Sequence, residues 1–410
     1  MSILANKRLL LGVSGGIAAY KAPELVRRLQ DAGADVRVVL TAAAERFVSP
    51  LALEVVSQHA VGRALWEPDG ASRIVHTDLG KEVDLIVLAP ATADLVGKIA
   101  GGLADDLLTT TVMACSTPVL VCPSMNTEML GNPFVRRNLD ALAAEARYTL
   151  LEPGVGLLAC GVTGPGRLPD PPEIIGAAAA VLTPKTLAGV RVVVSAGPTR
   201  EAVDPVRYLT NHSTGTMGFA LARAFAASGA DVTLVAGPVG LPTPVGVARR
   251  VDVASAADLA RAVADAWDAL DVLVMTAAVA DFRPRVPAAQ KIKKTDMAGE
   301  LAIALERTED VLATASARPG RAEKVLIGFA AETRDVERYA REKLARKGLD
   351  WIVANDVGAP GVGFGAGDNE VQLIGRSGAA VRYDRAPKDV IAASLVAALA
   401  ESIARKVRRG

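Results

Sequence analysis

The sequence predicts an α/β protein with two three-layer units, each a parallel sheet covered by helices on both faces. One observation is a repeated order of strand, Gly-containing turn, helix and strand, found over residues 9–40 and again over 190–236. Another is that the strand-like runs are short and apolar, which is typical of strands buried on both faces. A third is the sequence similarity between one segment of each copy, DAGADVRVVL and ASGADVTLVA. Together these predict two Rossmann-like sheets in one chain.

The first unit shows the pattern of an open parallel sheet, in which each strand is followed by a polar or Pro-containing turn. We expect, in order, a strand at 9–13, a turn at 14–16, a helix at 17–31 and strands at 36–40, 84–89 and 119–122. Gly33 suits the C-terminal end of the helix. Because ligands of such sheets bind beyond the carboxyl ends of the strands, chemistry is to be sought in the loops that follow them.

The second unit repeats this pattern after a break. We expect a strand at 190–195, a turn at 197–200, a helix at 217–228 and strands at 231–236 and 272–275. The two copies differ too much in sequence and loop length for a solenoid repeat. The boundary should lie within 168–189, where four prolines surround an Ala-rich stretch. We place it near residue 190, which gives domains 1–190 and 191–410.

Composition excludes several classes of protein. Only 4% of residues are aromatic although 50% are hydrophobic, so the cores must be mainly aliphatic. Lys and Arg (46) balance Asp and Glu (45), which argues against nucleic acid or an anionic membrane as a partner. Cys115, Cys122 and Cys160 form no C-x-x-C pair and no even set, so we expect neither a disulfide framework nor a cysteine metal site. Without a signal peptide or an apolar run of about 18 residues, the expected location is the cytoplasm.

The loop after the first strand is a candidate phosphate site. Ser14, Gly15 and Gly16 precede a helix, and backbone N–H groups at a helix start bind phosphate, although glycines there can equally serve only the turn. The loop is not G-x-G-x-x-G, and the second strand ends in Thr41 rather than an acidic residue. A mononucleotide such as FMN is therefore favoured over a dinucleotide.

Four more segments of the first unit carry candidate residues. They are His76, PATAD with Thr92, PSMNTEM with Asn126, and GVGLLACGVTGPGR with Cys160. The alternative for His76 is a structural or surface role, and for Thr92 and Asn126 it is ordinary helix N-capping. Cys160 has little apolar cover in its Gly-rich loop, which favours an accessible thiol.

Taken together, these segments resemble the flavin-dependent cysteine decarboxylases over residues 7–172. The sequence departs from the family pattern in having PATAD for a PASANT-like motif and Leu130 where Trp is usual. The resemblance implies FMN, which oxidises the substrate thiol to a thioaldehyde. The thiocarbonyl group, which is β to the carboxylate, then accepts the electrons left behind when CO2 departs. The implied flavin-binding residues are Ser14, Gly15, Gly16, Thr41 and Thr92. By the same resemblance His76 is the base or proton carrier, Asn126 binds the substrate carboxylate, Met129 contacts substrate and Cys160 delivers the final proton.

The second unit has its own candidates. A polar insertion at 198–215 is dense in Arg, Asn and hydroxyl groups, which favours anion binding over a simple surface excursion. The strand expected at 272–275 is followed directly by TAAVADFRP, and KIKK follows at 291–294. Lys343 and Lys347 share one helix face. Polyphosphate binding is one interpretation of these lysines, and a solvated or salt-bridged surface is the other.

This half resembles the bacterial phosphopantothenate–cysteine ligases over residues 191–405. The resemblance is carried by AGPTREAVDPVRYLTNHSTGTMG, TAAVADFRP, KIKK, GFAAET and ANDV, in that order. It implies that CTP, with Mg2+, converts the carboxylate of 4'-phosphopantothenate into an acyl-cytidylate that cysteine then attacks. Asn211 is implied to hold the acyl-phosphate region, Arg207 the substrate phosphate and Lys291 the triphosphate and carboxylate. The implied nucleotide-binding residues are Met275, Thr276, Ala277, Asp281, Asp310, Val311, Phe329, Lys343 and Lys347, with the metal ligands unknown.

Both resemblances together identify the chain as similar to fused bifunctional enzymes of coenzyme A biosynthesis. They imply a homo-oligomer, with trimers through the first half, dimers through the second and a dodecamer in combination. An NAD-dependent dehydrogenase or epimerase is disfavoured, because G-x-G-x-x-G and Tyr-x-x-x-Lys are missing. A regulator that has lost its chemistry should lack the reactive cysteine, and a stand-alone peptide cysteine decarboxylase does not need the second half.

Overall fold

The computed structural model describes residues 3–65, 75–293, 301–332, 334–356, 365 and 367–408. The chain forms two compact units, Met1–Thr183 and Pro184–Gly410. The sequence placed the boundary near 190, whereas Leu187 and Val190 already belong to the hydrophobic core of the second unit. The predicted fold class is confirmed, since each unit is a mainly parallel sheet between two helical layers.

The sheet of the first unit is parallel throughout, in the order β2-β1-β3-β4-β5. Its strands are β1 (Arg8–Val13), β2 (Asp35–Leu40), β3 (Leu85–Ala91), β4 (Val119–Pro123) and β5 (Tyr148–Leu150). The chain direction across the sheet reverses between β1 and β3, and this switch point is where open α/β sheets bind ligands. The same strand order is found in flavodoxin-like folds, which hold FMN there.

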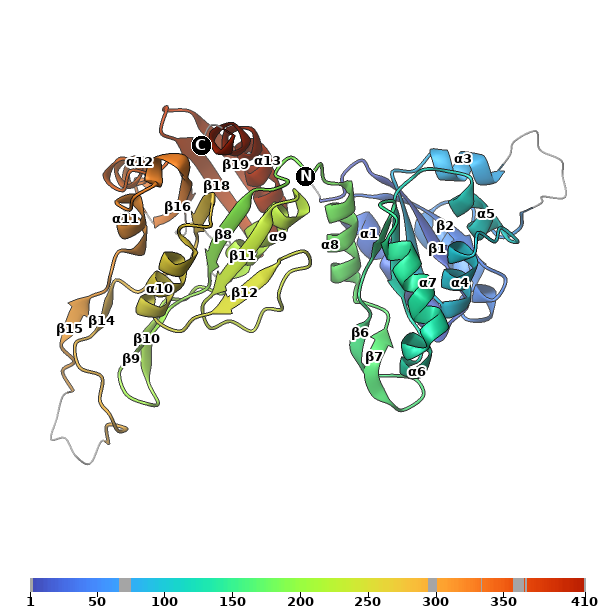
Figure 1. Cartoon of the computed structure of the whole chain (residues 1–410), viewed down its shortest axis with the longest axis horizontal. Helices are drawn as coiled ribbons and strands as arrows, with labels where there is room; N and C mark the ends of the chain where they lie inside the picture. Colours follow the sequence, from blue (N-terminus) through green and yellow to red (C-terminus); the bar gives the residue numbers. More distant parts are fainter. Residues whose placement is uncertain are drawn as a thin grey trace. The chain divides into compact units, whose positions relative to one another are not determined.

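Helices cover both faces of this sheet (Figure 1). One face carries α1 (Ala22–Asp31), α2 (Pro50–Ser57) and α8 (Pro171–Leu182), and the other α4 (Ala93–Ala100), α5 (Leu107–Met113) and α7 (Pro133–Ala143). Strand side chains alternate between the two cores, with Leu9 and Leu11 facing one and Leu10 the other. The shorter elements are η1 (Ile17–Lys21), η2 (Ala44–Arg46), α3 (Val75–Lys81), α6 (Thr127–Gly131) and the hairpin β6 (Gly154–Leu157) and β7 (Thr163–Arg167).

The helix expected over 17–31 differs from the prediction. It is divided into the 3-10 turn η1 and the α-helix α1, which begins with Pro at its first turn. Proline lacks an N–H and presets φ for a helix start, so it favours a new helix beginning here.

The second unit has an eight-stranded sheet in the order β12-β11-β8-β13-β16-β17-β18-β19. Its strands are β8 (Arg191–Ala196), β11 (Asp231–Ala236), β12 (Arg249–Asp252), β13 (Val272–Met275), β16 (Val325–Glu332), β17 (Trp351–Asp356), β18 (Asp368–Gly375) and β19 (Ala380–Pro387). The first six in this order are parallel, and β18 and β19 are antiparallel additions at one edge. The switch point lies between β8 and β13.

Two helices, α9 (Thr216–Ala227) and α13 (Lys388–Val407), pack on one face of this sheet. The opposite face carries α10 (Ala256–Ala266), α11 (Val311–Ser316) and α12 (Val336–Arg346). The remaining elements are η4 (Arg321–Glu323) and the hairpins β9 (Arg200–Ala202) with β10 (Tyr208–Thr210) and β14 (Phe282–Pro284) with β15 (Leu305–Arg307). The polar insertion predicted at 198–215 is therefore partly a hairpin, β9–β10. Within the described parts of both units, no helix is long and apolar enough to cross a bilayer.

Candidate functional sites

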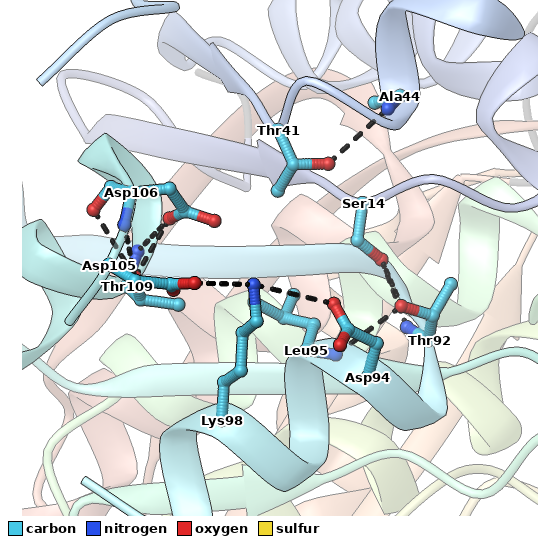
Figure 2. Close-up of polar contacts among 10 residues, drawn as sticks. All are labelled: Ser14, Thr41, Ala44, Thr92, Asp94, Leu95, Lys98, Asp105, Asp106 and Thr109. Atoms are coloured by element: carbon cyan, nitrogen blue, oxygen red, sulfur yellow. Dashed lines mark hydrogen bonds and ion pairs between the residues drawn. The ribbon is translucent and has the colours of Figure 1, made fainter. Parts of the chain in front are cut away.

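The switch point of the first unit is held together by Ser14. This buried serine follows β1, and its hydroxyl donates to the carbonyl of Pro90 at 2.7 Å. It also accepts from the backbone N–H of Thr92 at 2.9 Å, and the two hydroxyl oxygens lie 3.1 Å apart (Figure 2). Thr41 follows the neighbouring strand β2 and accepts from the N–H of Ala44. Three predicted flavin-binding hydroxyls therefore follow three adjacent strands at one edge of the sheet.

The glycine after Ser14 is required by close packing. A Cβ on Gly15 would lie 2.3 Å from the Cβ of Ala43, so any larger residue would push the loop after β1 away from the loop after β2. Gly16 is the N-cap of η1, and Ile17 beside it is 58% exposed. The edge thus combines a small-residue loop with an uncovered apolar side chain.

Thr92 also caps a helix, as the alternative interpretation expected. Its hydroxyl accepts from the N–H of Leu95 at the start of α4. One turn later, Lys98 pairs with Asp105 at 3.0 Å and with Asp94 at 3.7 Å (Figure 2). The hydrogen bond to Asp105 raises the pKa of Lys98. Capping and ion pairing both fix the loop that presents Thr92 to Ser14.

A second polar pair lies on the β6–β7 hairpin and α6. The amide nitrogen of Asn126 lies 3.2 Å from the sulfur of Cys160, which is exposed. The amide oxygen of Asn126 accepts from the N–H of Glu128 at 2.7 Å and so caps α6. Met129, in the same short helix, is 48% exposed. Capping orients the Asn126 side chain so that its N–H2 faces the thiol.

The hairpin is attached to α6 through its second strand. The N–H of Met125 donates to the carbonyl of Gly166 at 3.0 Å, and the hydroxyl of Thr127 donates to the carbonyl of Pro165 at 2.9 Å. Gly166 has φ of +136°, and a Cβ there would lie 2.1 Å from the carbonyl oxygen of Met125. Only glycine fits this contact, which sets where Cys160 stands relative to Asn126.

His76 lies elsewhere in the unit. It is half-buried in α3, which packs on α5. In Figure 1, α3 and the β6–β7 hairpin lie at opposite ends of the first unit. One copy of the chain therefore does not bring His76 to the pair of Asn126 and Cys160. Residues 66–74, which precede α3, lie outside the described residues.

In the second unit a serine again bridges the switch point. Ser195 of β8 accepts from the backbone N–H groups of Thr276 and Ala277, at 3.2 and 3.1 Å, and the Thr276 hydroxyl donates to the Ser195 carbonyl. Asn211 donates from its side chain to the carbonyl of Ala278 at 3.0 Å. The loop after β13 is thus fixed by contacts from β8 and from the segment after β10.

These loops open onto a cavity of about 800 Å³. Ten residues predicted from the sequence line it: Asn211, Met275, Thr276, Ala277, Asp281, Asp310, Val311, Phe329, Lys343 and Lys347. They come from strand ends, helix starts and connecting loops along the carboxyl edge of the parallel strands. A volume of this size suits a nucleotide together with part of a second substrate.

The two lysines predicted on one helix face make different contacts. Lys343 donates to the carbonyl of Phe329 at 2.8 Å, and Lys347 pairs with Asp310 at 2.7 Å. Burial alone would raise the pKa of Asp310, but the hydrogen bond from Lys347 keeps it below its usual value. Asp310 also caps α11 by accepting from the N–H of Ala313. The salt-bridged alternative therefore holds for Lys347, which at the same time faces the cavity.

Arg207 and Lys291 do not line the cavity as described. They are brought near each other by the carboxylate of Asp204, which accepts from the side chain of Arg207 and from the backbone N–H of Ile292 at 3.1 Å. Arg207 also donates to the carbonyl of Ile292 at 2.6 Å. Burial opposes ionisation of Asp204, but these hydrogen bonds hold its pKa well below its usual value. Lys291 is exposed, and Lys294 lies outside the described residues.

The cavity also contains polar residues that the sequence reasoning did not select. Thr216 begins α9, Asn355 is near the end of β17, Asn369 is near the start of β18, and Lys388 begins α13. Among the described residues, the buried side-chain oxygen of Asn355 has no hydrogen-bond partner, so it remains an acceptor for a ligand. The one available signal was that Lys388 is a cation at the start of a long helix, where the helix dipole disfavours it.

Fold and sites together define a two-domain α/β enzyme, with a flavodoxin-like unit followed by a Rossmann-like unit that has a nucleotide-sized cavity. The family model Flavoprotein matches residues 2–183, and that of the DNA/pantothenate metabolism flavoprotein C-terminal domain matches 187–403. The chain belongs to the family of bifunctional coenzyme A biosynthesis proteins.

Three relatives illustrate the match. The coenzyme A biosynthesis bifunctional protein CoaBC of Vibrio cholerae serotype O1 is 46% identical over 382 residues, which cover 92% of this chain and 94% of that protein. The Bacillus subtilis (strain 168) protein of the same name is 48% identical over 379 residues, covering 92% of each. The crystal structure of a CoaBC C-terminal domain is 37% identical, covers 53% of this chain and 98% of that one, and has a TM-score of 0.45.

Proposed function

We propose that the chain converts 4'-phosphopantothenate and cysteine into 4'-phosphopantetheine in two reactions. The second unit, Pro184–Gly410, would join the two substrates with CTP, and the first unit, Met1–Thr183, would decarboxylate the product with FMN. The proposal is supported by family membership over both units. The observation that carries it is that ten residues chosen from sequence motifs line a single cavity.

The ligase reaction needs an activated carboxylate, because oxide is too poor a leaving group for an amine to displace. A carboxylate oxygen of phosphopantothenate attacks the α-phosphorus of CTP, and pyrophosphate leaves. The amine of cysteine then attacks the acyl carbon, loses a proton and displaces CMP. Asn211 lines the cavity with Lys343 and Lys347. We propose that Asn211 binds the acyl-phosphate region and that the two lysines supply positive charge near it.

CTP with Mg2+ fits the polar groups of this cavity. Among the described residues no group of three or more His, Cys, Asp and Glu side chains is arranged to hold a metal. Mg2+ usually binds substrate phosphates, waters and only one or two carboxylates, so such a cluster is not needed. Asp281, Glu309 and Asp310 line the cavity and offer carboxylates to a phosphate-bound ion. Arg207 and Lys291 would reach substrate from the segment that Asp204 organises.

The first unit fits FMN at its switch point. Ser14, Gly15, Gly16, Thr41 and Thr92 would hold the phosphate end, and the exposed Ile17 would lie against the ring system. When bound, FMN supplies oxidation of the substrate thiol to a thioaldehyde and the later return of those electrons. Asn126 would bind the substrate carboxylate beside Met129, and Cys160 would donate a proton to the decarboxylated product. His76 is proposed to accept or carry the proton released in the oxidation.

A homo-oligomer, a dodecamer by resemblance, would allow another copy to supply His76. The separation of α3 from the β6–β7 hairpin within one chain supports this. So do the large apolar side chains exposed on η1 and α2, among them Tyr20 at 60%, Leu51 at 67% and Val55 at 69%. The cytoplasm is the proposed compartment, because Cys160 must stay a thiol.

Two assays test the halves separately. Denatured protein should release FMN, identified by mass, at one equivalent per chain. Pyrophosphate should be released from CTP only when both 4'-phosphopantothenate and Mg2+ are present, with ATP as the comparison nucleotide. A protein that binds no flavin and releases no pyrophosphate would contradict the proposal.

A further inference from the structure

One buried cation in the cavity has no role in the reaction derived above. Lys388 is the first residue of α13, is only 8% exposed and lines the cavity. Its ammonium lies 3.1 Å from the hydroxyl oxygen of Thr216, at the start of α9. The cavity wall here is built by the starts of α9, β18 and α13, which are distant in sequence.

The start of α13, where Lys388 lies, is an unfavourable place for a positive charge when no anion is bound. The start of a 20-residue helix carries the positive end of the helix dipole. Burial also lowers the pKa of Lys388, because the charged ammonium loses hydration. An anion in the cavity would reverse both effects, because it would pair with the ammonium and the dipole together.

The neighbouring start of α9 is equally suited to an anion. The 12-residue helix α9 begins at Thr216, and its N-cap is Gly215, a residue with no side chain to satisfy the first N–H groups. Gly215, Thr216, Met217 and Gly218 all line the cavity. The first turn of α9, the Thr216 hydroxyl and the Lys388 ammonium therefore converge on one region.

We propose that Lys388 and Thr216 bind a phosphoryl group of a substrate in this cavity, so that Lys388 is a further substrate-binding residue of the ligase reaction. The inference rests on the proposed function for its choice of ligands. A phosphoryl group is common to CTP and to 4'-phosphopantothenate. Lys388 would supply charge and Thr216 a hydroxyl donor to its oxygens.

The test compares Lys388→Met and Lys388→Arg with the parent protein. Binding of CTP and of 4'-phosphopantothenate to the full chain is measured by calorimetry, which needs no turnover, and KM for each is measured by pyrophosphate release. Lys388→Met should weaken binding of one of the two by about tenfold, and Lys388→Arg should restore most of it. Which ligand is weakened identifies the source of the phosphoryl group.

Lys324→Met is the matched control, because Lys324 is also 8% exposed but donates to the carbonyl of Leu270 away from the cavity. It should leave both affinities within twofold of the parent. Unchanged binding in Lys388→Met, or an equal loss in Lys324→Met, would overturn the inference, as would a parent that binds neither ligand. A parent protein that binds CTP but forms no amide would overturn the proposed function. Comparing CTP binding by the Lys388 variants with that parent would still test whether Lys388 binds a phosphoryl group.

Discussion

At the scale of residues, the three thiols of the chain occupy contrasting surroundings. Cys160 is exposed beside the amide of Asn126, whereas Cys122 is fully buried in β4. Burial raises the pKa of Cys122, because the thiolate loses its hydration. Since the thiolate is the reactive form, burial and the raised pKa both disfavour reaction at Cys122, whereas Cys160 is exposed to reagents.

We therefore expect iodoacetamide to label Cys160 in the folded protein and to leave Cys122 unlabelled. Peptide mass mapping after short exposures at pH 8 measures both sites, and urea-unfolded protein is the control in which all three thiols react. Labelling of Cys122 as fast as Cys160 in the folded protein would contradict the described burial.

At the scale of elements, the position of Cys160 depends on how the β6–β7 hairpin is attached to α6. Gly166→Ala places a Cβ 2.1 Å from the carbonyl oxygen of Met125, so the hairpin must move. We expect decarboxylation to fall by about a hundredfold, since a displacement near 1 Å has that effect on positioned groups. Ligation should be unchanged.

Gly131→Ala is the control for this substitution, because a Cβ there meets nothing within 4 Å. Decarboxylation by that variant should match the parent. If Gly166→Ala decarboxylates normally, the hairpin does not set the geometry of the site.

The start of β8 is fixed to the loop before β13 by an ion pair. Arg191 and Asp271 are 2.6 Å apart, and Asp271 also accepts from the backbone N–H of Arg191. Burial would raise the pKa of Asp271, but the hydrogen bonds from Arg191 leave it below its usual value. The resulting stability is therefore present above the unfolded-state pKa of about 3.9 and is lost as pH falls through the folded-state pKa.

Asp271→Asn should accordingly lower the free energy of unfolding of the second unit by about 1 kcal/mol at pH 7. The difference from the parent should shrink as pH falls from 4 to 3. Urea unfolding followed by the fluorescence of Trp267 and Trp351 measures it. A difference that stays constant or grows towards low pH would contradict the assigned ion pair.

Regular elements were the most predictable features from sequence. The strands expected at 231–236 and 272–275 are β11 and β13 with the same bounds, because a short apolar run ending in a turn predicts a buried strand directly. The break between η1 and α1 was missed, because apolar spacing continues through it. The antiparallel β18 and β19 were also not predicted.

Residues of the candidate sites could be predicted from sequence where they belong to a recognisable motif. Asn211 and Lys347 were chosen from separate motifs and line one cavity. Lys388 and Thr216 were not found, because 172 positions separate them and only the folded sheet brings their helices together. The separation of His76 from Cys160 was equally invisible, since residue spacing does not show which end of a unit a helix occupies.

At the scale of the whole molecule, two chemistries are assigned to two units of one chain. Each unit has its own sheet, core and switch point. Substitutions in one unit should therefore leave the reaction of the other intact, which a single shared active site would not allow.

Asn211→Ala should slow ligation by about a hundredfold, the usual effect of removing one well-placed donor to developing charge. The same variant should still decarboxylate 4'-phosphopantothenoylcysteine supplied to it. Cys160→Ala should ligate normally and stop at an oxidised, decarboxylated product. Mass spectrometry of both reactions checks the separation, and loss of both activities in either variant would argue against it.

The most direct test is to incubate the purified full chain with 4'-phosphopantothenate, cysteine, CTP and Mg2+ and to follow all products by mass. The account predicts 4'-phosphopantetheine, CMP, pyrophosphate and CO2 from a protein that shows a flavin spectrum. A colourless protein that forms no amide between phosphopantothenate and cysteine would contradict it.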